Sequence, residues 1–158
     1  MIEHKLLAIY LNDHYAASQA ARDVAVRSAS SNQGNEFGDY LGQLVHEMEA
    51  ERTELERIMD ALGIAVDRFK VTGAWAAEKI GRLKLNGRLR EYSPLSRVIE
   101  LEGLSAGINA KLGLWRGLQL LLGRGEVIPS DGFDHLIAQG EAQRARVEEL
   151  RLKAIELL

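Results

Sequence analysis

The feature that most constrains the fold is a helical periodicity that continues with few breaks through most of the chain. Residues 3–30 contain no proline or glycine, and apolar residues such as Leu7, Leu11 and Val24 recur there at three- and four-residue spacing. This spacing places one apolar stripe along a helix. The pattern recurs three more times, so the sequence predicts long helices over 3–30, 36–62, 94–122 and 131–157.

Residues with strong preferences for helix ends lie between these segments. Gly34 suits the end of the first helix, and Asn35 suits the N-cap of the second. Pro94 follows Ser93 and fits the first turn of the third helix. Ser130 or Asp131 is expected to cap the fourth helix.

The connections between the predicted helices differ in length, and this difference predicts the topology. The first and last connections are short, so each joins two antiparallel neighbours, whereas the middle one covers residues 63–93. Within it, Asp67 can cap a shorter helix inside 67–85, and Asn86-Gly87 marks a turn. We therefore expect one all-α domain over residues 1–158, a four-helix bundle with one long crossover. Its second and third long helices should run in the same direction.

The composition excludes several classes of protein. The chain has no cysteine, which rules out disulfides, thiolate zinc sites, iron–sulfur clusters and cysteine nucleophiles. It lacks both an apolar run long enough to span a membrane and the pattern of a signal peptide, so we expect a cytoplasmic protein. A net charge of −3 is not that of a general nucleic-acid binder. Its serines have no histidine and acid at a spacing that suggests nucleophilic catalysis.

Several polar side chains fall on the apolar faces when residues are placed at steps of about 100° around each helix. The inward set has one member from each long helix, with Glu141 on the flank of the fourth: His14, Glu51, Glu102 and Arg144. The same construction places Arg97, Glu100 and Lys111 on the solvent side of the third helix, and Asn12 on that of the first. Because isolated buried charges are costly, the inward residues are expected to pair with one another or with a ligand.

This arrangement resembles the ferritin-like superfamily, whose di-iron members carry a lone Glu on two helices and Glu-x-x-His on the other two. Glu102 is similar to the lone glutamate of the third helix, and His14 stands where the first helix of the family has Glu. The two remaining motifs begin at Glu51 and Glu141, with Glu54 and Arg144 at the histidine positions. The resemblance therefore implies a ferritin-like bundle without the full di-iron ligand set.

Two interpretations of this polar cluster follow. In the first, a buried ion-pair network replaces the metal site, with Arg144 bridging Glu51 and Glu102 in a non-catalytic binding or assembly module. It predicts no cofactor, and no stoichiometric iron on elemental analysis. In the second, the chain is a metal-binding protein or oxidase that holds iron or manganese through His14, Glu51, Glu102 and Glu141. The first is favoured because the arginine charge repels a metal cation.

The crossover is basic and offers a third hypothesis. Residues 67–91 carry three acidic residues and seven basic ones, a balance of +4: Arg68, Lys70, Lys79, Arg82, Lys84, Arg88 and Arg90. They could bind an anionic partner such as nucleic acid or a phospholipid headgroup. The favoured alternative is packing against the acidic second helix, whose balance over 36–62 is −6.

The third helix is unusually rich in glycine. Gly103, Gly107, Gly113 and Gly117 each weaken a helix interior. They permit close approach of another backbone, either the crossover helix or a second copy of the chain, and they equally suit a pocket or a bound ligand. We favour the close approach and expect a homo-oligomer, with a dimer as the preferred state. Trp75 and Trp115 are expected to be packing anchors.

Overall fold

The computed structural model of this chain describes residues 3–68, 92–126, 128 and 132–158. Four long helices account for most of these residues, and the described residues contain no strand. The helices are α1 (His4–Ser31), α2 (Glu36–Ala61), α5 (Pro94–Gly123) and α6 (Asp134–Ile155). The four predicted long helices are therefore confirmed. The predicted short helix within 67–85 and the turn at Asn86-Gly87 lie almost wholly outside the described residues.

Most of the predicted helix ends have the expected chemistry. The Asn35 side chain accepts hydrogen bonds from the backbone N–H groups of Phe37 (3.0 Å) and Gly38 (3.2 Å). The residue before it, Gly34, has φ +82°, a conformation that favours glycine. Ser93 caps α5 by accepting from the Ser96 N–H, with Pro94 in the first turn. The fourth helix differs, because it begins at Asp134 with Phe133 at the N-cap position, not with Ser130 or Asp131.

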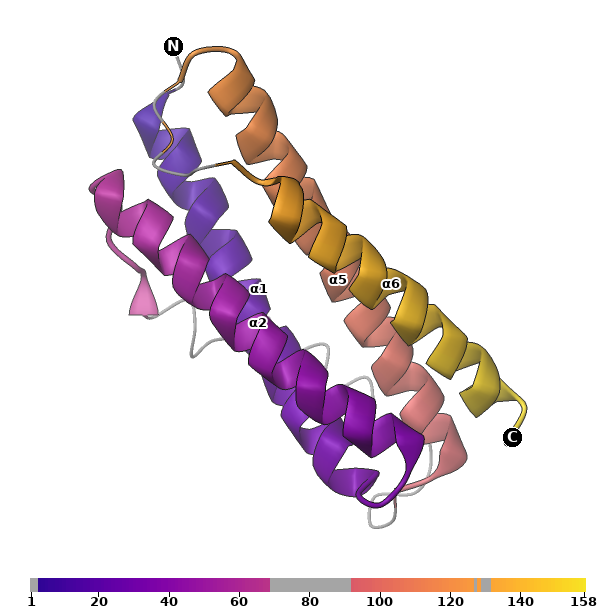
Figure 1. Cartoon of the computed structure of the whole chain (residues 1–158). Coiled ribbons are helices and arrows are strands. Elements are labelled where there is room, and N and C mark those ends of the chain that lie inside the picture. The colour runs from indigo at the N-terminus through magenta and orange to yellow at the C-terminus, as the bar shows by residue number, and fades with distance from the viewer. Residues whose placement is uncertain (1–2, 69–91, 127, 129–131) are drawn as a thin grey trace.

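Contacts between the helices establish their directions. Within each hairpin the partners are antiparallel: Arg22 reaches Glu49 between α1 and α2, and Arg151 reaches Glu102 between α5 and α6. Lys153, near the end of α6, pairs with Glu36 at the start of α2, so α2 and α6 are also antiparallel. It follows that α2 and α5 run in the same direction, as the connection lengths predict (Figure 1).

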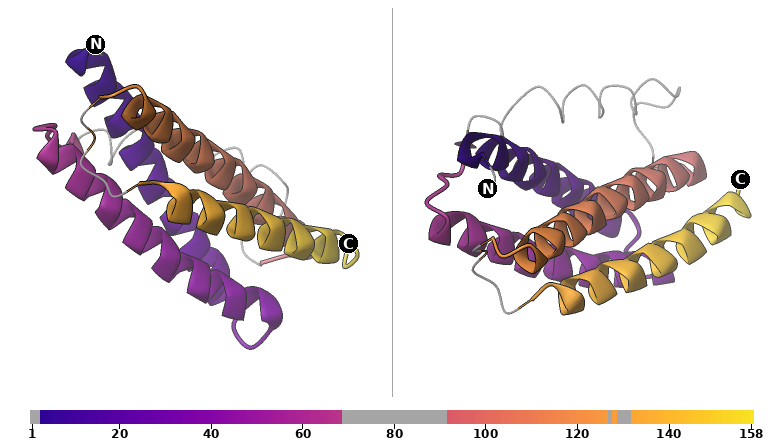
Figure 2. Two further views of the ribbon diagram at one scale, coloured as in Figure 1. Left: turned by 45° about the horizontal axis from the view of Figure 1, so that its top comes forward. Right: turned by 90° about the horizontal axis from the view of Figure 1, so that it is seen from above.

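The packing between helices is uneven. Helix α1 packs along both α2 and α5, and α5 packs along α6, whereas α2 and α6 contact each other much less. Figure 2 shows the two hairpins, α1–α2 and α5–α6, lying face to face. No described helix is both long enough and apolar enough to cross a membrane.

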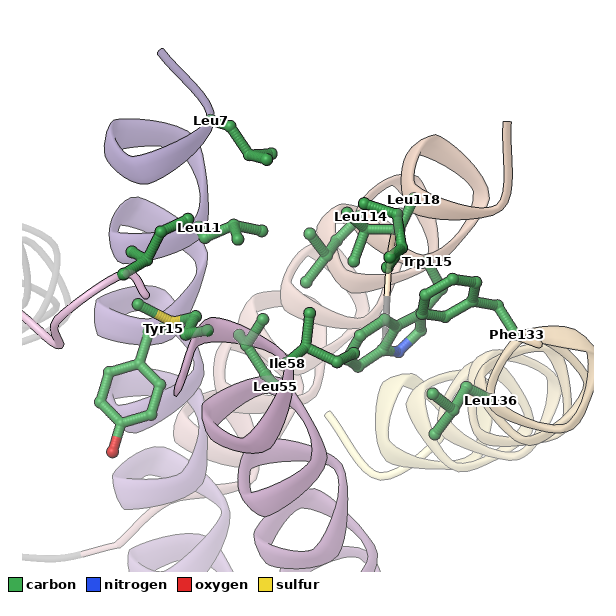
Figure 3. Packing of buried hydrophobic residues seen from close by; sticks show 13 residues of the cluster. Leu7, Leu11, Tyr15, Leu55, Ile58, Leu114, Trp115, Leu118, Phe133 and Leu136 are labelled. Atoms are coloured by element: carbon green, nitrogen blue, oxygen red, sulfur yellow. The ribbon is translucent and has the colours of Figure 1, made fainter. Parts of the chain in front are cut away.

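The buried apolar side chains form two clusters at opposite ends of the bundle. The first lies where α1 begins and α2 ends, and there the Trp115 indole stacks on Phe133 with ring centroids 6.0 Å apart (Figure 3). The second cluster includes Phe37, Leu104 and Val147. Between the two clusters the inward positions are occupied largely by polar or small residues. The middle of the bundle is therefore where a site can form.

One expectation about exposure on the first helix is wrong. Asn12 is buried, because its side chain accepts from the Asp67 N–H (2.6 Å) and donates to the Ala65 carbonyl (3.1 Å), which fixes the segment after α2. At the other end of the chain, Leu157 and Leu158 are exposed.

Candidate functional site

A cleft of about 640 Å³ lies at the middle of the bundle, bounded by α1, α2 and α5. Its walls are made largely of small side chains, including Ala17 and Ala21 on α1 and Gly103, Ala106 and Gly107 on α5. These residues extend little from the helix axes, so the space between α1 and α5 is not filled. A Cβ added at Gly103 would meet no atom of the described residues within 4 Å, which shows how open this wall is.

The inner end of the cleft carries a buried ion pair between α2 and α5. The Lys111 ammonium donates to one carboxylate oxygen of Glu51 and to the side-chain oxygen of Gln143 on α6. The Gln143 amide nitrogen donates in turn to Glu51 (3.1 Å) and Glu47 (2.8 Å). Glu51 and Gln143 are only 3% and 2% exposed and the Lys111 side chain 15%, so these three residues are largely withdrawn from water, whereas Glu47 is half-buried.

Burial dominates the electrostatics of this pair. It raises the pKa of the Glu51 carboxyl, and the nearby Lys111 charge only partly opposes the shift. It also lowers the pKa of Lys111, again against the effect of Glu51. Burial therefore disfavours the charged form of each partner, and the charge of the other partner counteracts this effect.

The predicted inward residues separate into two groups. Glu51 is buried as predicted. His14 is half-buried on the wall of the cleft, with its ring edge-on to Tyr10 at 4.6 Å, and burial lowers its pKa, so the imidazole is neutral at pH 7. These two residues belong to the site in the structure.

The inward placement of Arg144 and Glu102 is wrong. The Arg144 side chain is 54% exposed and pairs with Glu141 on its own helix (Nε to Oε2, 2.8 Å). Glu102 is 53% exposed and lies 3.6 Å from Arg151. Arg144 therefore reaches Glu141 but neither bridges Glu51 and Glu102 nor enters the core. It is the neighbouring residue, Gln143, that faces the bundle axis.

Three members of the inward polar set were missed. Lys111 and Glu100 were placed on the solvent side of α5, yet the Lys111 side chain is only 15% exposed and Glu100 is buried. Glu100 accepts from Arg27 (3.1 Å) and Tyr92 (3.1 Å), which ties the end of α1 to the start of α5. The third missed residue is Gln143.

A strict seven-residue repeat provides the signal that finds Lys111 and Gln143. In α5 the buried residues Leu104, Ile108 and Trp115 define a stripe with alternating spacings of three and four, and Lys111 falls on it. Gln143 lies on the matching stripe of α6 between Gly140 and Val147. Such stripes mark the inner seam of packed helices. A single broad apolar arc cannot locate this seam on α5, which is apolar around most of its circumference.

The structure bears only in part on the two other hypotheses, the basic crossover and the metal site. Of the basic crossover residues, only Arg68 belongs to the described part, and Lys70, Lys79, Arg82, Lys84, Arg88 and Arg90 lie outside it. Among the described residues, no group of three or more His, Asp or Glu side chains is arranged to hold a metal ion. Comparisons with protein-family models, curated proteins and solved structures find no match to this chain.

Proposed function

We propose that this chain is a non-catalytic ferritin-like helical bundle that acts as a binding module, and that the cleft between α1, α2 and α5 receives an apolar small molecule. The parallel course of α2 and α5, with residues 62–93 between them, supports the ferritin-like arrangement. The mid-bundle position of the polar cluster also supports it, because ferritin-like proteins build their sites there.

The observation that carries the proposal is the cleft itself. Its volume of about 640 Å³ falls within the range of about 300–1,000 Å³ that is typical of small-molecule sites. Interior glycines such as Gly103 and Gly107 each cost a helix about 0.5–1 kcal/mol relative to alanine. Both line the cleft, so the space that they leave open for a bound molecule explains why they are present despite this cost.

The polar cluster supports a binding role in preference to metal chemistry. Lys111 supplies one fixed positive charge at the place where a di-iron protein holds its cations, and its ammonium is already bonded to Glu51. Of the alternative ligand set, Glu102 and Glu141 lie at the surface beside Arg151 and Arg116. The residues present therefore do not fit an iron or manganese pair, and no reaction is proposed.

A matched pair of glycine variants tests the cleft as a binding site. Gly103 and Gly113 both lie on α5 with open space at the Cβ position, but only Gly103 lines the cleft. Gly103→Phe should weaken binding of the neutral fluorescent probe N-phenyl-1-naphthylamine by about tenfold or more, equivalent to about 1.4 kcal/mol. Gly113→Phe should leave the affinity nearly unchanged.

Fluorescence titration of the three proteins measures these affinities, and thermal melting confirms that each variant is folded. Equal probe affinity in all three proteins would refute the cleft as the binding site. So would the absence of probe binding to the unmodified chain.

A further inference from the structure

We infer that the ligand of the cleft carries one carboxylate on an apolar chain, and that Arg52 of α2 recognises this head group. The inference rests on the proposed function, because it specifies the chemistry of the molecule that the same cleft receives.

Most of the charged groups that line the cleft already have partners. Glu51 is bonded to Lys111, and Glu102 lies beside Arg151. Glu100 accepts from Arg27 and Tyr92. His14 is neutral at pH 7 because burial lowers its pKa. These groups need nothing from a ligand.

Arg52 differs from them. Its Nη2 donates to the neutral hydroxyl of Tyr15 (2.9 Å), and the guanidinium carbon lies 4.8 Å from the centre of the Tyr15 ring. Its Nε–H is buried, and no atom of the described residues accepts a hydrogen bond from it. Within the described part of the chain, Arg52 forms no ion pair. On the outer side of α2, Glu49 interacts electrostatically with Arg52, but its hydrogen-bonded ion pair is with Arg22.

A buried donor without an acceptor is rare in folded proteins, and it is most costly when the donor carries a charge. The tyrosine contact holds the guanidinium in place but does not neutralise it. An oxygen acceptor with a negative charge satisfies both requirements, and guanidinium–carboxylate hydrogen bonds are among the strong ones. The apolar walls beside Arg52 suit a hydrocarbon chain attached to that head group. A fatty-acid-like carboxylate has this combination of parts.

The test compares decanoate with decanol, which has the same chain and no charge, by isothermal titration calorimetry at neutral pH. Arg52→Gln removes the charge and keeps a hydrogen-bonding side chain. Arg57→Gln is the matched control, because Arg57 lies on the same helix, is 53% exposed and pairs with Glu54 outside the cleft. We expect Arg52→Gln to weaken decanoate binding by about tenfold while decanol binding is unchanged. Arg57→Gln should bind both compounds as the unmodified chain does.

The other outcomes distinguish failure of the carboxylate inference from failure of the proposed function. If decanol and decanoate bind equally and both lose affinity in Gly103→Phe, the carboxylate inference fails and the proposed function stands. Equal weakening of both compounds in Arg52→Gln would also overturn the inference, since Arg52 would then only shape the cleft. If neither compound is affected by Gly103→Phe, the proposed function fails together with the inference.

Discussion

Replacing Lys111 by methionine is expected to lower the free energy of unfolding by about 3–5 kcal/mol, because it leaves the Glu51 carboxylate buried without a counter-charge. Glu51 is 3% exposed and loses its ammonium partner, while the Gln143 amide is its remaining hydrogen-bond donor in the cluster. Methionine has nearly the same length as lysine and a similar helix propensity, so the effect reports mainly on the charge.

Urea unfolding of two further variants separates this charge effect from lost packing. In Lys111→Met/Glu51→Gln both charges are gone, so we expect most of the lost stability to return. Lys153→Met is the surface control, because Lys153 is 40% exposed and its pairing with Glu36 and Glu149 is screened by water. This control should change stability far less than Lys111→Met. A loss of similar size in all three variants would contradict the account of the buried pair.

The destabilisation of Lys111→Met should also depend on pH. Burial already raises the pKa of Glu51 in the folded protein, and removal of Lys111 deletes the charge that opposes this shift. A carboxyl whose folded-state pKa lies above its unfolded value of about 4.3 destabilises the fold at high pH. That cost disappears as the pH falls below both values. The difference between variant and parent should therefore shrink from pH 7 to pH 5, and a constant difference would contradict it.

Gly38→Ala is expected to lower the free energy of unfolding by about 1–3 kcal/mol, the range typical of overpacking, with a value near its upper end. A Cβ at this position of α2 would lie 2.1 Å from the Asn32 carbonyl oxygen and 2.6 Å from the Asn32 carbonyl carbon. Both atoms belong to the backbone at the end of α1, so no side-chain rotation can relieve the contact. The α1–α2 turn itself would have to shift.

Gly42, one turn further along α2, provides the control. A Cβ there would meet nothing within 4 Å in the part of the chain that the structure describes, so Gly42→Ala should stabilise the chain by about 0.5–1 kcal/mol through its helix propensity. Thermal unfolding of both variants tests the difference in sign. Equal effects would show that the α1–α2 turn is less tightly packed than the structure indicates.

The helices and their directions were predictable from the sequence because local signals determine them. The Asn35 cap, Gly34 and Pro94 each have a conformational preference that acts within one or two residues. The direction of α5 relative to α2 followed from the lengths of the connections alone. The start of α6 was misplaced because Ser130 and Asp131 are good caps, whereas Phe133 occupies the cap position and packs under Trp115.

The site was less predictable, since it depends on the rotation of each helix about its axis. Glu51 lies on a strongly amphipathic helix, and its inward position was evident. Lys111 is a residue type that is mostly exposed in proteins, and it lies on a helix with apolar residues on nearly every side. Gln143 and Arg144 are neighbours in the sequence, so their side chains differ by about 100° around the axis of α6. An error of one residue step therefore decides which of them is predicted to face the bundle axis. The cleft was not predictable in detail, because its volume depends on the distances between helices. The small residues of α1 and α5 are the sequence feature that is consistent with it.

The central claim is that the cleft between α1, α2 and α5 is the site where this chain binds an apolar molecule. Photolabelling with a small neutral aryl diazirine, followed by mass spectrometry of the labelled peptides, tests it most directly. The account predicts labels within residues 14–24, 48–55 and 99–115, and their loss in the presence of excess N-phenyl-1-naphthylamine. Labels that resist competition, or that concentrate on the exposed apolar end of the chain at Leu152, Leu157 and Leu158, would contradict it.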